Sequence, residues 1–160
     1  MTHHGDALRS GETALKAQLP ENAGLSFVGV IHTPFKTRDD CPRQGDMEGP
    51  DCTIELDPRL EPALEGIERF ETLEILYWLH KARRDLLTQS PRSDGAVRGT
   101  FALRSPLRPN PIGTSRVRLV ARTGNVLTVR GLDCLDGTPL LDIKPDRCGY
   151  TVQAPPKPAG

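Results

Sequence analysis

The chain has 160 residues, enough for one domain with a hydrophobic core, and its 21 Lys and Arg residues balance its 21 Asp and Glu residues. This balance excludes a global positive field that would draw the protein to nucleic acid or membrane, so any RNA binding has to come from a local patch. We find no apolar run long enough for a bilayer and no secretory signal pattern. The four cysteines lack metal-site spacing, so we expect reduced thiols, no metal and a cytoplasmic protein.

The amino-acid composition of the chain changes at Leu25. Residues 1–24 are polar and glycine-containing, which predicts a partly disordered appendage with room for a short helix over residues 14–19. Residues 25–31 are rich in β-formers and end at a Thr-Pro break, which predicts a strand. Residues 36–51 form a long loop in which Pro42-Arg43-Gln44 offers a fixed turn with a guanidinium and an amide.

The middle of the chain predicts two strands separated by a short helix. Residues 52–56 alternate apolar and polar side chains, as in a half-buried strand. Residues 58–70 carry apolar side chains at helical spacing. Residues 72–80 read as a largely buried strand that contains the only tryptophan, and we expect a loop after Asp85, through Pro91 and Gly95.

The last part of the chain is dominated by strands and tight turns. Gly124-Asn125 and Asp136-Gly137 are strong turn signals. The strands predicted around them cover residues 97–103, 115–122, 126–132 and 139–145. The whole pattern predicts an all-β fold, a single small β-barrel of six to eight mainly antiparallel strands with one or two short helices. We expect it over residues 25–150, followed by a proline-rich tail over residues 151–160.

A proline-rich segment, Arg104-Ser-Pro-Leu-Arg-Pro-Asn-Pro-Ile-Gly113, lies between two predicted strands. Each proline fixes its own φ and pushes the preceding residue toward extended geometry, so we expect a stiff loop. Arg104 and Arg108 on such a loop would suit an anionic ligand at a small entropic cost. A structural connector with two solvated arginines is the equally weighted alternative, and a polyproline ligand for a partner domain is a minor one.

Three segments together resemble the TsaA-like (TrmO/YaeB) family. They are the proline-rich segment, the run Asp136-Gly-Thr-Pro-Leu-Leu-Asp-Ile-Lys-Pro145, and Gly29-Val-Ile-x-Thr-Pro34 with Pro42-Arg-Gln44 downstream. The resemblance covers roughly residues 25–146. It implies a single barrel and a homodimeric S-adenosylmethionine-dependent tRNA methyltransferase, which modifies N6 of threonylcarbamoyladenosine beside the anticodon.

The resemblance also implies a role for individual residues of this chain. The cofactor S-adenosyl-L-methionine would be bound by Pro42, Arg43, Gln44, His80, Lys81, Arg104, Thr114, Leu135, Asp136, Gly137, Thr138 and Pro139. Catalytic candidates are His80 and Asp142, since the acceptor nitrogen has to lose a proton. Arg108, Asn110 and Lys144 are candidates for substrate binding. From residue chemistry alone, Asp142 should pair with Lys144 or an arginine of the proline-rich segment, because an unpaired carboxylate in an apolar strand is costly.

Other functions remain open from the sequence. Asp146 stands where many family members have tyrosine, and the chain ends shortly after the barrel motif where longer members carry a further domain. These departures leave room for the same scaffold acting on a small molecule or another RNA. A non-catalytic barrel that binds RNA or a nucleotide through its arginines is the alternative from another class.

Overall fold

The computed structural model describes residues 7–92 and 94–146, so the predicted tail over residues 151–160 lies outside the described residues. The chain divides into two compact units. The barrel unit comprises Ser26–Tyr77 and the described residues from Thr114 onward. The small-sheet unit comprises the described residues up to Leu25 and Trp78–Gly113. No helix within residues 7–92 and 94–146 is long and apolar enough to cross a membrane.

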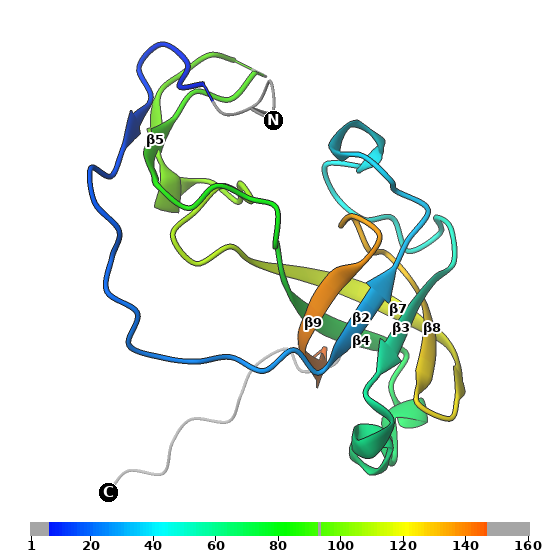
Figure 1. Cartoon of the computed structure of the whole chain (residues 1–160). Coiled ribbons are helices and arrows are strands. Elements are labelled where there is room, and N and C mark those ends of the chain that lie inside the picture. Colours follow the sequence, from blue (N-terminus) through cyan, green and yellow to red (C-terminus); the bar gives the residue numbers. More distant parts are fainter. Residues whose placement is uncertain (1–6, 93, 147–160) are drawn as a thin grey trace, which may run out of the picture. The chain divides into compact units, whose positions relative to one another are not determined.

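Six strands close into a barrel in the order β2-β3-β8-β7-β4-β9, which confirms the predicted fold class (Figure 1). Strand β9 pairs with both β4 and β2, and the pairings around the barrel are antiparallel. The strands are β2 (Gly29–His32), β3 (Cys52–Leu56), β4 (Thr72–Trp78), β7 (Ile112–Thr123), β8 (Val126–Arg130) and β9 (Thr138–Pro145).

Alternating apolar side chains fill the barrel. Along β4 and β8 every second residue is buried, as expected when successive side chains of a strand point to opposite faces. The fully buried side chains include Ile31, Ile54, Leu73, Ile75, Val117, Leu127, Val129 and Leu140. The strand predicted over residues 25–31 is shorter than expected because only Gly29–His32 pairs, with β3 and β9, while Leu25 and Phe27 are exposed.

Short 3₁₀ helices replace the predicted helix over residues 58–70. They are η2 (Pro58–Leu64) and η3 (Ile67–Arg69). Pro62 has no N–H to donate within η2, and Gly66 adopts a left-handed conformation with φ of 81° between the two. The helical spacing of the apolar residues therefore indicated helical turns over residues 58–70, but Pro62 and Gly66 prevent a continuous α-helix.

The small-sheet unit differs most from the sequence prediction. It contains a sheet in the order β1-β5-β6, formed by Thr13–Ala14, Leu86–Gln89 and Arg98–Gly99. The expected appendage therefore contributes a strand, and the helix expected over residues 14–19 is wrong because Thr13 and Ala14 pair with β5. The strand predicted over residues 97–103 becomes β6 followed by the 3₁₀ helix η4 (Thr100–Ala102).

Asp146, the residue that departs from the family pattern, has a structural role after β9. Its side chain is buried and forms an ion pair with the Arg116 guanidinium of β7. Its N–H donates to the Thr72 carbonyl at 3.2 Å, so the chain continues along β4 beyond the strand. The carboxylate thus ties the end of β9 to β7.

Candidate functional site

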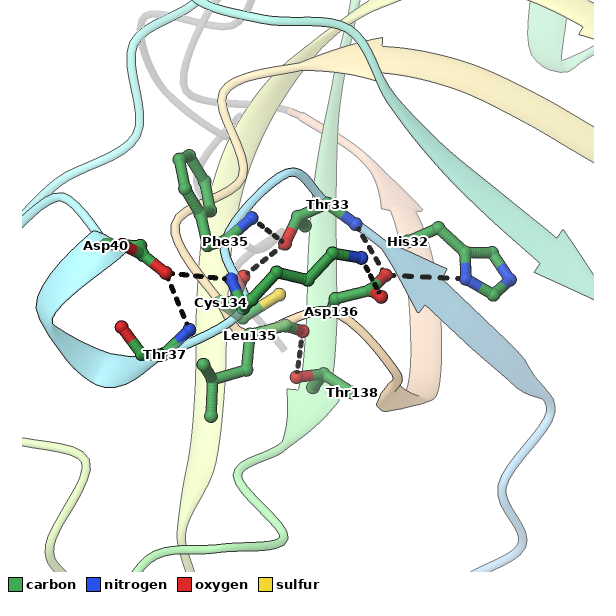
Figure 2. A network of polar contacts seen from close by, with 10 residues as sticks. His32, Thr33, Phe35, Thr37, Asp40, Cys134, Leu135, Asp136 and Thr138 are labelled. Atoms are coloured by element: carbon green, nitrogen blue, oxygen red, sulfur yellow. Dashed lines mark hydrogen bonds and ion pairs between the residues drawn. The ribbon is translucent and has the colours of Figure 1, made fainter.

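The turn between residues 135 and 139 is tied to the end of β2. Asp136 accepts a hydrogen bond from the Thr33 N–H at 3.1 Å, and its Oδ2 lies 2.5 Å from Lys36 Nζ (Figure 2). The N–H groups of Asp136 and Gly137 donate to Phe35 O and Ile31 O, each at 2.8 Å. The bond to Lys36 holds the pKa of Asp136 below its ordinary value, so the carboxylate is ionised at neutral pH. Asp136 is therefore a structural clamp.

Buried hydroxyls fix the remainder of this turn and leave one side of it open. Thr138 is buried, and its hydroxyl donates to Leu135 O at 2.6 Å. Thr33 donates in the same way to Cys134 O at 2.8 Å (Figure 2). Gly137 is exposed at φ of 81°, and a Cβ built on it would meet nothing within 4 Å. The predicted residues Leu135–Pro139 thus form a rigid turn with open space beside Gly137.

The loop that carries Pro42, Arg43 and Gln44 is fastened on both sides of these residues. On one side, the 3₁₀ helix η1 (Arg38–Asp40) is closed by Asp40, whose Oδ2 accepts from the N–H groups of Lys36 and Thr37 at 3.1 and 2.8 Å. On the other side, Gly45 packs so tightly on Gly131 that a Cβ at Gly45 would lie 1.6 Å from Gly131 O. This loop, residues 36–45, is called the clamp loop below.

The three predicted residues at the tip of the clamp loop are exposed. Arg43 and Gln44 have no hydrogen bond or ion pair within the described part of the chain, so their polar groups are free for a ligand. Lys36 of the clamp loop contacts Asp136 of the 135–139 turn. At the other end of the clamp loop, Gly45 packs against Gly131, which follows β8. The barrel unit therefore brings together two of the sequence-predicted cofactor segments.

A polar trio that the sequence analysis did not predict links β4, β7 and the residue before Cys134. Tyr77 on β4 and Ser115 on β7 are 3% and 7% exposed. The Tyr77 hydroxyl lies 2.7 Å from both Ser115 Oγ and Asp133 Oδ1, and Ser115 Oγ donates to the same Asp133 oxygen at 3.2 Å. Tyr77, Ser115 and Asp133 were not among the predicted site residues. No local motif marks the trio, because its members come from three distant positions in the chain.

The other predicted residues of the barrel unit lie outside these two segments. Thr114 donates to Glu74 Oε1 at 3.1 Å on neighbouring strands. Asp142 pairs with Lys144 at 3.8 Å, as predicted, but both side chains are more than half exposed. The expected desolvation cost at Asp142 is therefore absent. Asp142 also lies roughly 13 Å along β9 from Thr138, at about 3.3 Å per residue.

In the small-sheet unit, His80 and Lys81 follow β4 and are both exposed. Partial burial, and then the Lys81 charge, lower the pKa of His80, which keeps its imidazole neutral at pH 7. Arg104 is exposed and has no hydrogen bond or ion pair among the described residues. The His80 and Arg104 side chains are thus accessible from solvent.

The buried side-chain amide of Gln89 anchors the proline-rich loop. Gln89, 5% exposed, donates to Thr100 Oγ1 at 3.0 Å and to Leu107 O at 2.7 Å. Thr100 in turn donates to Leu86 O at 2.8 Å. Gln89 was not singled out by the sequence analysis, since a lone glutamine carries no motif. It makes the loop a fixed element of the small-sheet unit.

Two arginines complete this support. Arg108 is half-buried, and its Nη1 donates to the carbonyls of Leu103 and Ser105, so part of its guanidinium is used within the loop. Arg84 donates to Pro109 O at 2.7 Å, with its guanidinium 5.2 Å from the Trp78 ring centroid. Its Nη2 lies 3.5 Å from Asn110 Oδ1. Arg108 and Asn110 therefore both have structural contacts beside any role toward a substrate.

Comparison with known proteins identifies one family and several relatives of this chain. The family model described as the tRNA-methyltransferase O N-terminal domain matches residues 30–149. A Rhizobium radiobacter protein, named as the probable S-adenosyl-L-methionine-binding protein VirR, is 54% identical over 144 residues, covering 90% of this chain and 82% of that protein. A Homo sapiens tRNA (adenine(37)-N6)-methyltransferase is 34% identical over 130 residues, which are 74% of this chain and 29% of that protein.

A solved structure with a related name also matches this chain. The crystal structure of TrmO from Pseudomonas aeruginosa matches with a TM-score of 0.67 at 35% identity, over 85% of this chain. The match covers 61% of that chain, so the present chain spans less than two thirds of the solved protein.

Proposed function

The chain belongs to the family of the tRNA-methyltransferase O N-terminal domain, and we propose that it is an S-adenosylmethionine-dependent methyltransferase acting on N6 of threonylcarbamoyladenosine next to the anticodon of tRNA. The observation that carries the proposal is that the Lys36–Asp136 ion pair holds the clamp loop against the 135–139 turn, while the Gly45–Gly131 contact fixes the other end of the loop in the same unit.

The groups available around these segments fit the chemistry of S-adenosylmethionine. This cofactor has a carboxylate, an ammonium, a sulfonium and an adenine base, and so needs partners of both signs and amide groups. Arg43 offers a free guanidinium, Gln44 a free amide, and Asp133 a carboxylate. The open side of Gly137 allows a ligand to approach the backbone closely, which a side chain at that position would hinder.

In the barrel unit, we assign the adenosyl part of the cofactor to Leu135, Asp136, Gly137, Thr138 and Pro139. The side chains of Asp136 and Thr138 form hydrogen bonds that stabilise the turn itself. They therefore act by holding the backbone of Leu135 and Gly137 in place. Pro42, Arg43 and Gln44 form the facing wall. Thr114 remains assigned to the cofactor by resemblance alone.

In the small-sheet unit, His80, Lys81 and Arg104 are assigned to the methionine part of the cofactor. The fixed proline-rich loop presents Arg104, so little side-chain support has to be ordered on binding. Arg108, Asn110 and Lys144 are assigned to the substrate. Arg108 keeps unbonded guanidinium nitrogens for a carboxylate or phosphate after its contacts with the loop.

The bound cofactor supplies a methyl group on a positively charged sulfur, so alignment with the acceptor is the main task of the protein. The acceptor nitrogen carries a proton that a neighbouring base can take. His80 suits this role because its lowered pKa leaves it neutral at pH 7. Asp142 suits it less, because it pairs with Lys144 on the exposed side of β9, away from the 135–139 turn.

The proposal also includes a homodimer, tRNA as partner and a cytoplasmic location. The chain is neutral overall, so tRNA contacts have to come from local arginines such as Arg104 and Arg108. The scaffold acting on a small molecule or another RNA, and a non-catalytic RNA-binding barrel, are the competing functions.

Mass spectrometry of tRNA nucleosides tests the proposal. Purified protein and S-adenosylmethionine are incubated with tRNA from cells that contain threonylcarbamoyladenosine but lack its N6-methyl form. We expect a mass gain of one methyl group on that nucleoside, and none on tRNA that lacks the threonylcarbamoyl group. Cofactor binding without any tRNA product would favour another acceptor, and tRNA binding without cofactor binding would favour the non-catalytic barrel.

A further inference from the structure

Asp133 directly precedes the segment Cys134–Pro139 and is assigned to neither cofactor segment of the barrel unit. It precedes Leu135 by two residues. The Asp133 charge, after burial itself, contributes to raising the pKa of Cys41, the residue before Pro42 in the clamp loop. Asp133 thus adjoins the 135–139 turn in sequence and acts electrostatically on the clamp loop.

The carboxylate is oriented by one oxygen only. Its Oδ1 accepts from the Tyr77 and Ser115 hydroxyls at 2.7 and 3.2 Å. Its Oδ2 has no hydrogen-bond partner among residues 7–92 and 94–146. The residue as a whole is half-buried.

The hydroxyl pair can serve only as a fixed support for this charge. Burial, and then the Asp133 charge, raise the pKa of Tyr77 far above its ordinary value, so the phenol keeps its proton and remains a donor. Two donors directed at one oxygen fix the orientation of the carboxylate. An asparagine oxygen would accept the same two hydrogen bonds, so the hydrogen bonds alone give no reason for a charge at position 133.

We propose that Asp133 faces the cationic sulfonium side of the methyl donor and gives the site its preference for S-adenosylmethionine over the neutral product, S-adenosylhomocysteine. The inference rests on the proposed function. A half-buried carboxylate is screened less than an exposed one, so an opposite charge a few ångströms away is attracted effectively. Removing the carboxylate charge should therefore weaken the cationic ligand selectively.

Calorimetric titration of the full chain with both ligands tests this. Asp133→Asn keeps the shape of the side chain and its acceptor oxygen. We expect at least tenfold weaker binding of S-adenosylmethionine, equivalent to about 1.4 kcal/mol, and a change below about threefold for S-adenosylhomocysteine. Sinefungin, which carries a charged amine in place of the sulfonium, should weaken like S-adenosylmethionine.

Two further variants separate charge from structure. Glu48→Gln makes the same charge change at a carboxylate that is 67% exposed and paired with Arg118, and both affinities should stay within about twofold of wild type. Ser115→Ala disturbs the trio but keeps the Asp133 charge, so the ratio of the two affinities should be retained even if both affinities fall. Thermal unfolding of each variant verifies that it is folded.

Three outcomes would overturn the inference. They are equal loss of both ligands in Asp133→Asn, no loss of either, or a Ser115→Ala variant with the same change of ratio as Asp133→Asn. If the wild type binds neither ligand, the proposed function falls together with the inference. Wild-type binding with an unchanged ratio in Asp133→Asn overturns the inference alone.

Discussion

Substitution of Gly45 by alanine should disable the clamp loop. A Cβ at this position would lie 1.6 Å from Gly131 O and 2.4 Å from the carbonyl carbon, and both atoms belong to the backbone. Cβ contacts below 3.0 Å are essentially absent from proteins, so the two segments have to separate by about 1.4 Å. Overpacking of this kind costs about 1–3 kcal/mol.

The displaced segment carries Arg43 and Gln44, so cofactor binding should suffer as well as stability. We expect Gly45→Ala to lower the free energy of unfolding by about 1–3 kcal/mol in a denaturant titration. Its affinity for S-adenosylmethionine, measured by calorimetry on the folded protein, should fall by at least about tenfold.

Gly24→Ala provides the matched control, because a Cβ there meets nothing within 4 Å. It should bind the cofactor like wild type and be equally stable or slightly more stable, since alanine restricts the unfolded chain. A Gly45→Ala protein that is destabilised but binds the cofactor normally would refute the role given to the clamp loop. Unchanged stability would refute the packing argument itself.

Three further predictions concern the small-sheet unit. Arg104→Ala should abolish cofactor binding in calorimetry while the circular dichroism of the barrel stays unchanged; normal binding would remove Arg104 from the site. Gln89→Leu should destabilise the protein by about 1–3 kcal/mol in denaturant unfolding, because the buried Thr100 hydroxyl and the half-buried Leu107 carbonyl lose their donor; an unchanged midpoint would argue against this. His80 should titrate below 6.5 by NMR, and Lys81→Gln should raise its midpoint. Since the unfolded state then binds more protons, the contribution of neutral His80 to stability is complete above pH 6.5 and declines below it; a midpoint at or above 6.5 would contradict this.

The parts of the fold that depend on local pattern could be predicted from sequence. Residues 52–56 alternate and form β3, and Gly124-Asn125 forms the turn between β7 and β8. The Asp136-Gly137 turn was likewise recognised from its residue types, and Gly137 adopts the expected positive φ. In each case a short-range signal and the closed barrel favour the same conformation.

The parts of the fold that depend on pairing between distant residues could not be predicted from sequence. Strand β1 has only two residues, and its existence depends on β5, which lies more than 70 residues away in the chain. The Tyr77–Ser115–Asp133 trio and the Gln89 support likewise combine distant positions. The sequence could place Arg108 on a stiff loop, but it could not show that the loop carbonyls would engage its guanidinium.

Calorimetric titration of the wild-type protein with S-adenosylmethionine tests the central claim most directly. The account predicts saturable binding that the Arg104→Ala and Gly45→Ala variants weaken and the Gly24→Ala variant retains. Absence of binding at millimolar cofactor to the folded wild-type protein would contradict the account, and it would make the RNA-binding barrel the better explanation of the arginines.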